Sequence, residues 1–502
     1  MIRLKYPLAF LVCFAAVAGN ASQVRAQLLE GLELTTQPLP SGARGLAMGG
    51  NLISSANGVD ALDFNPAAIA PIRSRELTLS LFNREHASNA QFLGTSSTAS
   101  LNAMSLSSIG IAAPFPTTQG HFAVGIAFDR IRDYTSTYHF SAVNPTSSYF
   151  NTQGFIQDPH SYGAGNRNFL GNTNLAYALG LTYDVPDSGV YALTTPITHG
   201  MLQSGTITTA GGLDAVRIGG GLDIAKGISA GASINILFGT YDYTDNYQEK
   251  NVNNIATDTG TAAPAGFQVA NITTTLHQDQ NGASLKFGLL MHRKIFNVGL
   301  TVETPEYMHI NQNSLQTGNA QFANVGPYSS DQMNALPVYI ETYDIVTPFR
   351  LGAGASVHLA GLTGSASISY ADMSQIQFSS GSVDMSALNT EARDSLRGVL
   401  AWQLGAEYVI PGTGLAVRGG YSFEPSPYKS DPTNYGVSAI SGGLGFELSK
   451  AVSLEAALRH SMYHTNHAIY NDLTPQGTPV SANIYDDVVT RDDVSVTFSY
   501  RY

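Results

Sequence analysis

The first segment that could carry out chemistry is Gly227-Ile-Ser-Ala-Gly231, which fits the G-x-S-x-G pattern of serine hydrolases. In those enzymes the serine stands on a turn between a strand and a helix, near a histidine and an acid. Glycine accounts for 50 of the 502 residues, so a chance match is expected. The segment also overlaps a run that alternates as a β-strand does: Ile228, Ala230, Ala232, Ile234 and Ile236. We therefore predict no catalytic residue and no enzyme activity.

Three histidines near a carboxylate form a second candidate site. His460, His464 and His467 precede Asp472, and the four side chains could gather a divalent ion. Their spacing matches no standard zinc motif, and a solvated loop is the simpler interpretation. The single cysteine, Cys13, lies in a segment that we expect to be removed. The sequence therefore predicts neither a metal nor a cofactor.

Residues 1–26 have the composition of a secretory signal peptide: two cations, a short apolar run and then small residues. We expect cleavage after Ala26. Cleavage removes the positive charges of Arg3, Lys5 and Arg25, so the net charge falls by three, from −12 to −15. The remaining chain shows no basic stripe, so nucleic acid is not an expected partner.

The rest of the chain repeats segments of about ten residues in which every second residue is apolar. The last segment, Val494 to Tyr502, ends on an aromatic residue. Charged residues are 12% of the chain, about half the usual share, and no run of about twenty apolar residues follows the signal. Without such runs, a membrane can be crossed only by a closed β-barrel. We predict an all-β, transmembrane, antiparallel barrel over residues 76–502, in a bacterial outer membrane.

Fourteen strands can be counted from these segments. Short turns alternate with long polar connections, and in barrels of this class the short turns face the periplasm. Leu175 to Val185 also alternates, which leaves room for a further hairpin within 132–205. The long connections are expected near residues 84–102, 132–205, 244–272, 304–347, 373–397, 424–437 and 463–486. The strands are expected to begin near Glu76, Ala103, His121, Thr206, Ile228, Thr273, Ile295, Pro348, Leu362, Gly398, Gly414, Ser438, Ala451 and Asp487.

Residues 27–75 fit no strand pattern and are rich in small side chains. A compact segment of this kind can fold inside a wide barrel, where a close approach to the wall requires small residues. Asn65 is placed to cap a short helix that begins with Pro66 and Ala67. We expect this segment to form a hatch in the lumen. Its candidate contact residues are Gly42, Arg44, Gly45, Gly49, Gly50, Asn65, Pro66 and Ala67.

Three features together resemble the FadL/TodX family of outer-membrane transporters of hydrophobic compounds. They are Gly-Ala-Arg-Gly-Leu-Ala-Met-Gly-Gly at 42–50, Asp-Ala-Leu-Asp-Phe-Asn-Pro-Ala at 60–67 and the aromatic closing strand. The resemblance implies a fourteen-stranded barrel, a hatch that contains Asn-Pro-Ala, a hydrophobic pocket, and a sideways opening at a kinked third strand. Val494 to Tyr502 is similar to the C-terminal signal read by the barrel-assembly machinery.

Arg44 has two possible surroundings within this architecture. It either pairs with an inward carboxylate of Glu407, Glu447 or Glu455 and anchors the hatch, or it faces the periplasm in solvent.

Two sets of residues are candidate substrate contacts. The first set either enters the hydrophobic pocket, as the resemblance implies, or forms a disordered tail: Leu28, Leu29, Leu32 and Leu34. The second set consists of arginines on the inward face of strands: Arg350, Arg418 and Arg459.

The predicted function is diffusion of hydrophobic small molecules, long-chain fatty acids or other hydrocarbons, into the periplasm. We expect a monomer surrounded by outer-membrane lipid. Two alternatives remain open. The same fold could serve as a scaffold or shuttle subunit of a protein-secretion system, which would have a stable protein partner. A lipase or protease is less well supported, because no Ser/His/acid set shares a lumen-facing or rim position.

Overall fold

The computed structural model describes residues 34, 38–152, 175–187, 190–253, 266–323, 325–332, 338–381, 385–473 and 479–502. The predicted signal peptide, Leu28, Leu29 and Leu32 lie outside these residues. Within the described ranges, no helix is long and apolar enough to cross a membrane.

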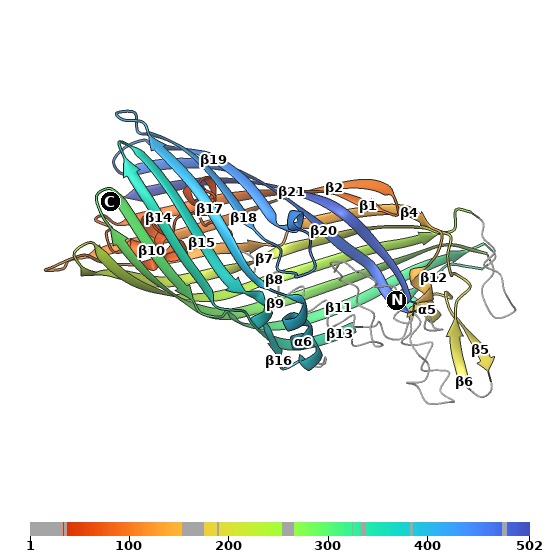
Figure 1. The fold of residues 1–502 in the computed structure, drawn as a ribbon. Coiled ribbons are helices and arrows are strands. Elements are labelled where there is room, and N and C mark those ends of the chain that lie inside the picture. The colour runs from red at the N-terminus through yellow and green to blue at the C-terminus, as the bar shows by residue number, and fades with distance from the viewer. Residues whose placement is uncertain are drawn as a thin grey trace.

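A closed antiparallel barrel forms the molecule, and β1 closes it by pairing with both β2 and β21 (Figure 1). The main sheet contains nineteen strands. Four wall strands are each broken into two segments and β12 is a short addition, so these nineteen make fourteen wall strands. The unbroken strands are β1 (Glu76–Phe92), β2 (Thr95–Phe115), β7 (Met201–Ala225), β8 (Ile228–Lys250), β9 (Phe267–His292), β17 (Gly398–Val409), β18 (Leu415–Glu424), β19 (Val437–Glu447), β20 (Val452–Leu473) and β21 (Pro479–Arg501).

The broken wall strands are each interrupted by two to four residues. They are β3 (Phe122–Asp133) with β4 (Ser136–Asn144), β10 (Phe296–Glu303) with β11 (Tyr307–Phe322), β13 (Val338–Val346) with β14 (Arg350–Leu359), and β15 (Leu362–Asp372) with β16 (Gln377–Ser379). The remaining strands are β12 (Tyr328–Ser329) and the separate pair β5 (Tyr183–Asp187) and β6 (Val190–Thr194).

Short helices occupy the hatch and the connections. The hatch contains α2 (Ala43–Ala47), η1 (Gly58–Asp60), α3 (Ala61–Phe64) and η2 (Pro66–Ile69). The connections contain η3 (Tyr149–Asn151), α5 (Leu175–Ala178), η5 (Ser330–Gln332), η6 (Met373–Gln375), α6 (Met385–Ser395) and η7 (Thr433–Tyr435).

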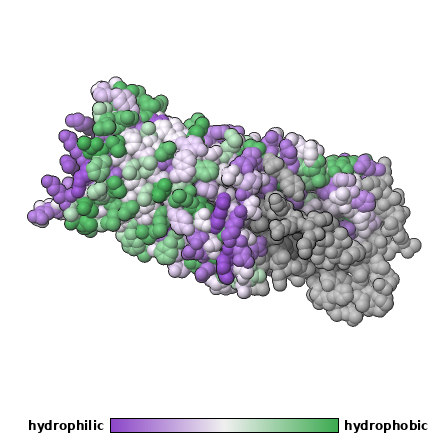
Figure 2. Space-filling view, viewed as in Figure 1, coloured by the Kyte–Doolittle hydropathy of each residue, from purple (hydrophilic) through white to green (hydrophobic). Residues whose placement is uncertain are grey.

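The period-2 pattern places apolar side chains on the outer surface of the wall. On β9, Leu285 and Phe287 are exposed, whereas Ser284 and Lys286, which point into the lumen, are buried. Figure 2 shows apolar residues gathered over the half of the barrel that carries the short turns, with hydrophilic residues beyond them at that end. We call this the apolar band. Its composition and position are those of a surface that faces lipid.

The expected long connections are wrong in extent, because the strands continue well beyond the apolar band. β1 and β2 are joined only by Leu93 and Gly94, although residues 84–102 were expected to be a loop. β8 likewise extends to Lys250 and β9 starts at Phe267. Outward residues there are polar, so these strands lack the alternation by which a half-buried strand is recognised.

The possible hairpin within residues 132–205 is present, but it is not part of the wall. β5 and β6 pair only with each other among the described strands. Leu175, where the alternating pattern begins, starts the helix α5 instead. The even count of fourteen wall strands is therefore confirmed.

This topology predicts which connections proteases can reach. In intact cells, proteinase K should cut between β4 and β7 or between β11 and β13, because those connections are long and lie at the end expected to face outside. The turns at Lys226 and Lys450 should stay protected. Mass spectrometry of the fragments would locate the cuts, and permeabilised cells provide the control. Cleavage at the short turns in intact cells would reverse the orientation.

Candidate functional site

The hatch crosses the lumen and touches opposite parts of the wall (Figure 1). α2 packs against β18, β19, β20 and β21, whereas η2 packs against β7, β8 and β9. Hydrogen bonds join the hatch to the wall. The amide of Ala43 donates to Thr497 Oγ1 at 2.8 Å, and Ser441 Oγ donates to the carbonyl of Ala47 at 2.9 Å. The end of the barrel that carries the short turns is therefore occupied by a folded plug.

The Asn-Pro-Ala triplet joins two parts of the hatch to the wall. Asn65 Oδ1 accepts a hydrogen bond from the amide of Ala67 at 3.1 Å, and Pro66 occupies the first position of the 3-10 helix η2. Asn65 Nδ2 donates to the carbonyls of Ile53 in the hatch and Leu289 in β9, at 2.9 and 3.1 Å. The predicted N-cap is confirmed, and the same amide also fixes the hatch to the barrel.

Glycines on the lumen face of the wall allow the hatch backbone to approach closely. A Cβ atom at Gly231 would lie 2.4 Å from the carbonyl carbon of Pro66, and one at Gly420 would lie 2.3 Å from the backbone nitrogen of Gly49. Gly49 itself has φ +70°, and a Cβ there would lie 3.0 Å from backbone atoms of Tyr421. Sequence reasoning found the small residues of the hatch but missed their counterparts in the wall.

Arg44 lies in a buried ion-pair network rather than in solvent. Its Nε and Nη2 donate to the two carboxylate oxygens of Glu407 at 3.0 and 3.2 Å, and Nη1 donates to the carbonyl of Ser55 at 2.9 Å. Glu407 also accepts from Arg418 at 2.6 Å, and Arg418 pairs with Glu455 at 2.8 Å. Of the two surroundings left open by the sequence, the anchoring pair is correct, and its partner is Glu407.

A second ion-pair network, which sequence reasoning missed, holds the other end of the hatch. Arg217 of β7 pairs with Asp63 of the hatch at 2.9 Å and with Asp129 of β3 at 2.7 Å. Lys286 Nζ donates to the backbone carbonyl of Asp63 at 2.7 Å and pairs with Glu303 at 3.3 Å. Because these charges are buried, removing one partner would leave the others unpaired at a large cost.

A polar cavity of about 250 Å³ lies beside the hatch toward the short turns. Arg44 and Arg418 line it together with carboxylates that include Asp60, Glu76 and Glu455. Burial of Asp60, with the negative charges of Glu455 and Glu76, raises the pKa of its carboxyl well above the ordinary value, against the opposing effect of Arg44. Arg418 is thus placed with the hatch anchor and away from the other two candidate arginines.

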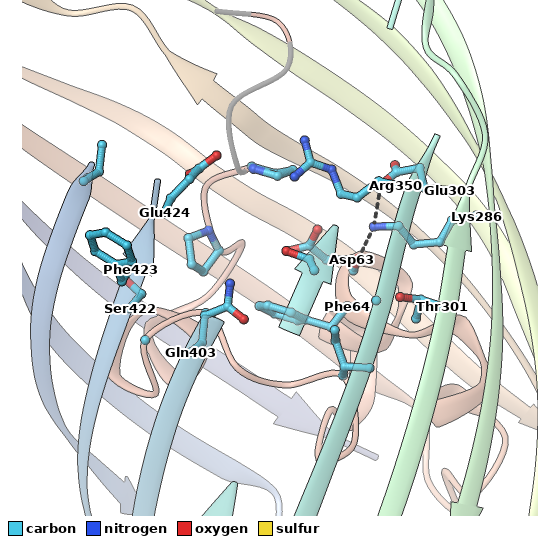
Figure 3. Close-up of a pocket in the computed structure, with 18 of the residues that line it drawn as sticks. Asp63, Phe64, Lys286, Thr301, Glu303, Arg350, Gln403, Ser422, Phe423 and Glu424 are labelled. Carbon is cyan, nitrogen blue, oxygen red and sulfur yellow. Dashed lines mark hydrogen bonds and ion pairs between the residues drawn. The ribbon is translucent and has the colours of Figure 1, made fainter. Parts of the chain in front are cut away.

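Arg350 and Arg459 line a different cavity, of about 100 Å³, at the opposite side of the hatch (Figure 3). Phe64 of the hatch and Phe423 of β18 supply aromatic surface. Lys286 supplies a third positive charge, and Asp63, Glu303 and Glu424 supply three carboxylates. The Nε of Arg459 is buried and makes no hydrogen bond to any described atom. The cavity therefore combines apolar surface with a guanidinium group that has hydrogen-bonding capacity left over.

Beyond this cavity the lumen is filled by apolar and aromatic side chains. Leu34, 1% exposed, packs in a cluster with inward residues that include Tyr134, Tyr241 and Tyr343. The guanidinium of Arg132 donates to the carbonyl of Leu34 and holds this part of the chain in place. Leu34 therefore lies in a hydrophobic region of the lumen, and its contact with substrate stays a prediction.

The third wall strand is broken between β3 and β4. Asp133 Oδ1 accepts from the amide of Thr135 at 3.0 Å, which forms a tight turn, and Tyr134 N donates to the carbonyl of Gly211 at 3.2 Å. The pairing of β3 with β7 shifts register between Arg130 and Arg132. After the break, β4 continues to pair with β7 but not with β2. The kink implied by the resemblance is present.

This break leaves part of the wall without strand pairing. β2 pairs with β3 only through Ser108–Phe115, so among the described strands its residues 95–107 pair with β1 alone. β4 lies close to both β1 and β2, and against β1 the rings of Phe92 and Phe140 are 5.2 Å apart. The side chains of Ala103 and Ser105, on the inner face of β2, are only half buried. The hydrogen-bonded wall is therefore interrupted between β2 and β4, although the two strands lie close together.

The residues of the two candidate sites for chemistry make contacts with neighbouring side chains. Ser229 Oγ donates to Asp223 Oδ1 at 2.6 Å, and Asp223 Oδ2 lies 2.6 Å from His121 Nδ1. The carboxylate thus stands between serine and histidine, whereas a nucleophilic serine requires the histidine in the middle. This arrangement does not activate the serine.

The three histidines have different neighbours. His460 pairs with Asp492 at 2.7 Å, His464 stacks on Tyr435 with ring centroids 6.1 Å apart, and His467 lies 3.7 Å from Asp487. The side chain of Asp472 lies outside the described residues.

The fold is shared with solved structures of low sequence identity. No protein-family model and no curated protein matches the sequence. The chain is similar to a FadL homologue of Pseudomonas aeruginosa, with 11% identity and a TM-score of 0.58, over 92% of this chain and 99% of that one. It is also similar to the toluene transporter TodX of Pseudomonas putida, with 13% identity and a TM-score of 0.52, over 92% and 98%. The expected FadL/TodX resemblance is confirmed at the level of the fold.

Proposed function

We infer that this chain is an outer-membrane channel of the FadL/TodX type, through which hydrophobic small molecules diffuse toward the periplasm. The observation that carries this inference is the interruption of strand pairing between β2 and β4, in a barrel whose lumen is plugged by the hatch. Water-soluble solutes need an open axial path, and the hatch occupies that path. A hydrophobic solute can instead leave sideways into lipid, where its transfer from water is favourable.

The route proposed here has three parts. A hydrophobic molecule is captured by the aromatic cluster around Leu34, moves past the kink at Tyr134 and leaves sideways where β2 and β4 are not paired. Diffusion down a gradient needs no energy source, so no catalytic step and no cofactor are invoked. The structure with the FadL fold and the one named as a toluene transporter support a hydrophobic cargo.

Within this class we propose a carboxylate-bearing chain, such as a long-chain fatty acid, as the preferred cargo. The cavity beside the hatch brings Lys286, Arg350 and Arg459 near Phe64 and Phe423, and two of its three carboxylates, Asp63 and Glu303, are already paired with Arg217 and Lys286. Lys286 is already paired, whereas the Nε of Arg459 has hydrogen-bonding capacity left. A carboxylate would satisfy this guanidinium through a charge-assisted hydrogen bond, and a neutral hydrocarbon would not.

Uptake by vesicles or by a transporter-deficient host tests both the proposed channel function and the proposed preference for carboxylates. Radiolabelled oleate should enter vesicles or cells that contain the parent protein faster than matched vesicles or cells that lack it. Arg459→Ala should lower oleate uptake about five- to tenfold, corresponding to the loss of one charge-assisted hydrogen bond of roughly 1–1.5 kcal/mol. Uptake of toluene should stay unchanged. Equal losses for both solutes would remove the preference for carboxylates, and a parent without any uptake would favour the secretion-scaffold alternative.

A further inference from the structure

The strands that extend beyond the apolar band carry an ordered polar surface on their outward face. Two rows of side chains run across β8, β9 and β11, where strand register places them directly opposite one another. We call these six residues the polar ladder: Gln248, Asn271 and Asn319 in one row, and Asn246, Thr273 and Thr317 in the other. Hydroxyl and amide groups of this kind both donate and accept hydrogen bonds.

Hydrogen bonds along the rows hold these side chains in fixed orientations. Gln248 Nε2 donates to Asn271 Oδ1 at 2.7 Å, and Asn271 Nδ2 donates to Asn319 Oδ1 at 2.9 Å. In the second row, Thr273 Oγ1 donates to Asn246 Oδ1 at 3.0 Å. An amide has more donor and acceptor positions than these contacts use. The surface is therefore preorganised, which lowers the entropy lost when a ligand binds.

The position of the polar ladder indicates what lies against it. On β9 the outward residues change from apolar Leu285 to polar Asn281, and Asn271 lies ten residues further along the strand. Ten residues span about 33 Å of strand, or about 25 Å above the apolar band for a strand tilted by about 40°. The polar ladder is thus continuous with the lipid-facing surface and lies beyond the lipid head groups, which extend only about 5–8 Å from the hydrocarbon core.

The charges of this face argue against recognition of phosphate. Asp242 of β8 is paired with His277 of β9 at 2.6 Å, immediately below the polar ladder. His277 lies between Asp242 and Asp279, and hydrogen bonding to Asp242 raises the pKa of its imidazole. The acidic groups here would repel anions, whereas neutral amides and hydroxyls match the hydroxyl groups of sugars.

We propose that the polar ladder binds the sugar chain of the glycolipid in the outer leaflet, lipopolysaccharide. The sugars extend outward from the same leaflet whose acyl chains cover the apolar band. Several weak hydrogen bonds to hydroxyl groups would then hold the projecting wall in the sugar layer. This inference rests on the proposed outer-membrane location, but it does not depend on which solute the channel carries.

Binding to purified glycolipids tests the proposal. The full mature chain in detergent would be titrated with rough lipopolysaccharide, which carries the core sugars, and with its lipid A portion alone, by native mass spectrometry. We expect at least tenfold tighter binding of the sugar-bearing form. The fourfold variant N246A/N271A/T273A/N319A should lose most of this difference. Asn271→Ala alone removes two of the three hydrogen bonds. It should reduce the difference in affinity between the two glycolipids about threefold.

A matched pair elsewhere on the wall provides the control. Asn83 of β1 and Asn102 of β2 face outward and exchange hydrogen bonds of 2.9 and 3.0 Å, but they are not part of the polar ladder. N83A/N102A should bind both glycolipids as the parent does, and heat-modifiability should verify folding of every variant. Equal affinity of the parent for both glycolipids, or parental affinity of a folded ladder variant, would overturn the proposal. Failure of oleate uptake with intact sugar-dependent binding would overturn only the proposed function.

Discussion

Replacing Gly49 with valine should open the barrel to ions. Gly49 has φ +70°, and a Cβ there would lie 3.0 Å from the backbone nitrogen and oxygen of Tyr421 and 3.2 Å from the carbonyl oxygen of Leu404. The disfavoured backbone conformation costs about 1–3 kcal/mol and overpacking costs about the same again. A plug that contacts the wall at this point should shift, while the hydrogen-bonded wall still closes. Planar-bilayer conductance should rise at least tenfold.

Gly94 supplies the matched control for this experiment. It also has a positive φ, +80°, but a Cβ there would meet nothing within 4 Å. Gly94→Val carries the same backbone penalty at the tip of the β1–β2 hairpin, far from the hatch. Its conductance should equal that of the parent. If both variants conduct equally, close packing against β18 does not hold the hatch in place.

Bulky side chains on the unpaired stretch of β2 should abolish uptake without disturbing the barrel. Ala103 and Ser105 lie on the inner face of β2, where the strand pairs with β1 alone, and both are half buried. Ala103→Trp with Ser105→Trp would place two indole rings between β2 and β4. If cargo leaves where β2 and β4 are not paired, oleate uptake should fall at least tenfold. Heat-modifiability should remain that of a folded barrel, because the wall hydrogen bonds are unaffected.

Met104 stands between these two residues and faces outward, with 73% of its surface exposed. Met104→Trp therefore adds an indole to the same strand on its outer face. Uptake by this variant should match the parent. Parental uptake by the inward double variant would exclude this stretch of the wall as the exit. Equal loss in both variants would indicate that β2 itself was disturbed.

Much of the wall could be predicted from the sequence because lipid and lumen impose opposite polarity on alternate residues. The hairpin around Pro411-Gly-Thr-Gly414 illustrates this: Leu404 and Val417 are exposed, while Arg418 is buried. Beyond the apolar band this contrast disappears, because water accepts polar residues on the outer face. The expected loops at 84–102 and 244–272 were consequently strands over most of their length.

The hatch was recognisable, but its contacts were only partly so. Asn65 and Pro66 have a local role in starting a helix, which sequence can reveal. Arg44 pairs with a residue far along the chain. The alternation of inward and outward residues reduced its possible partners to three carboxylates but did not select Glu407. The break before Thr135 depends on pairing with β7 and β2, so Asp133 alone gave no signal.

Contact through backbone atoms has a consequence for evolutionary divergence. Where the hatch meets the wall at Gly231 and Gly420, the fit is set by the absence of a side chain rather than by the identity of one. Elsewhere on the wall, a replacement need only be apolar where it faces lipid or polar where it faces the lumen. Many different sequences can satisfy these two conditions with the same backbone path. This tolerance accounts for a fold shared over 92% of the chain at 11% identity.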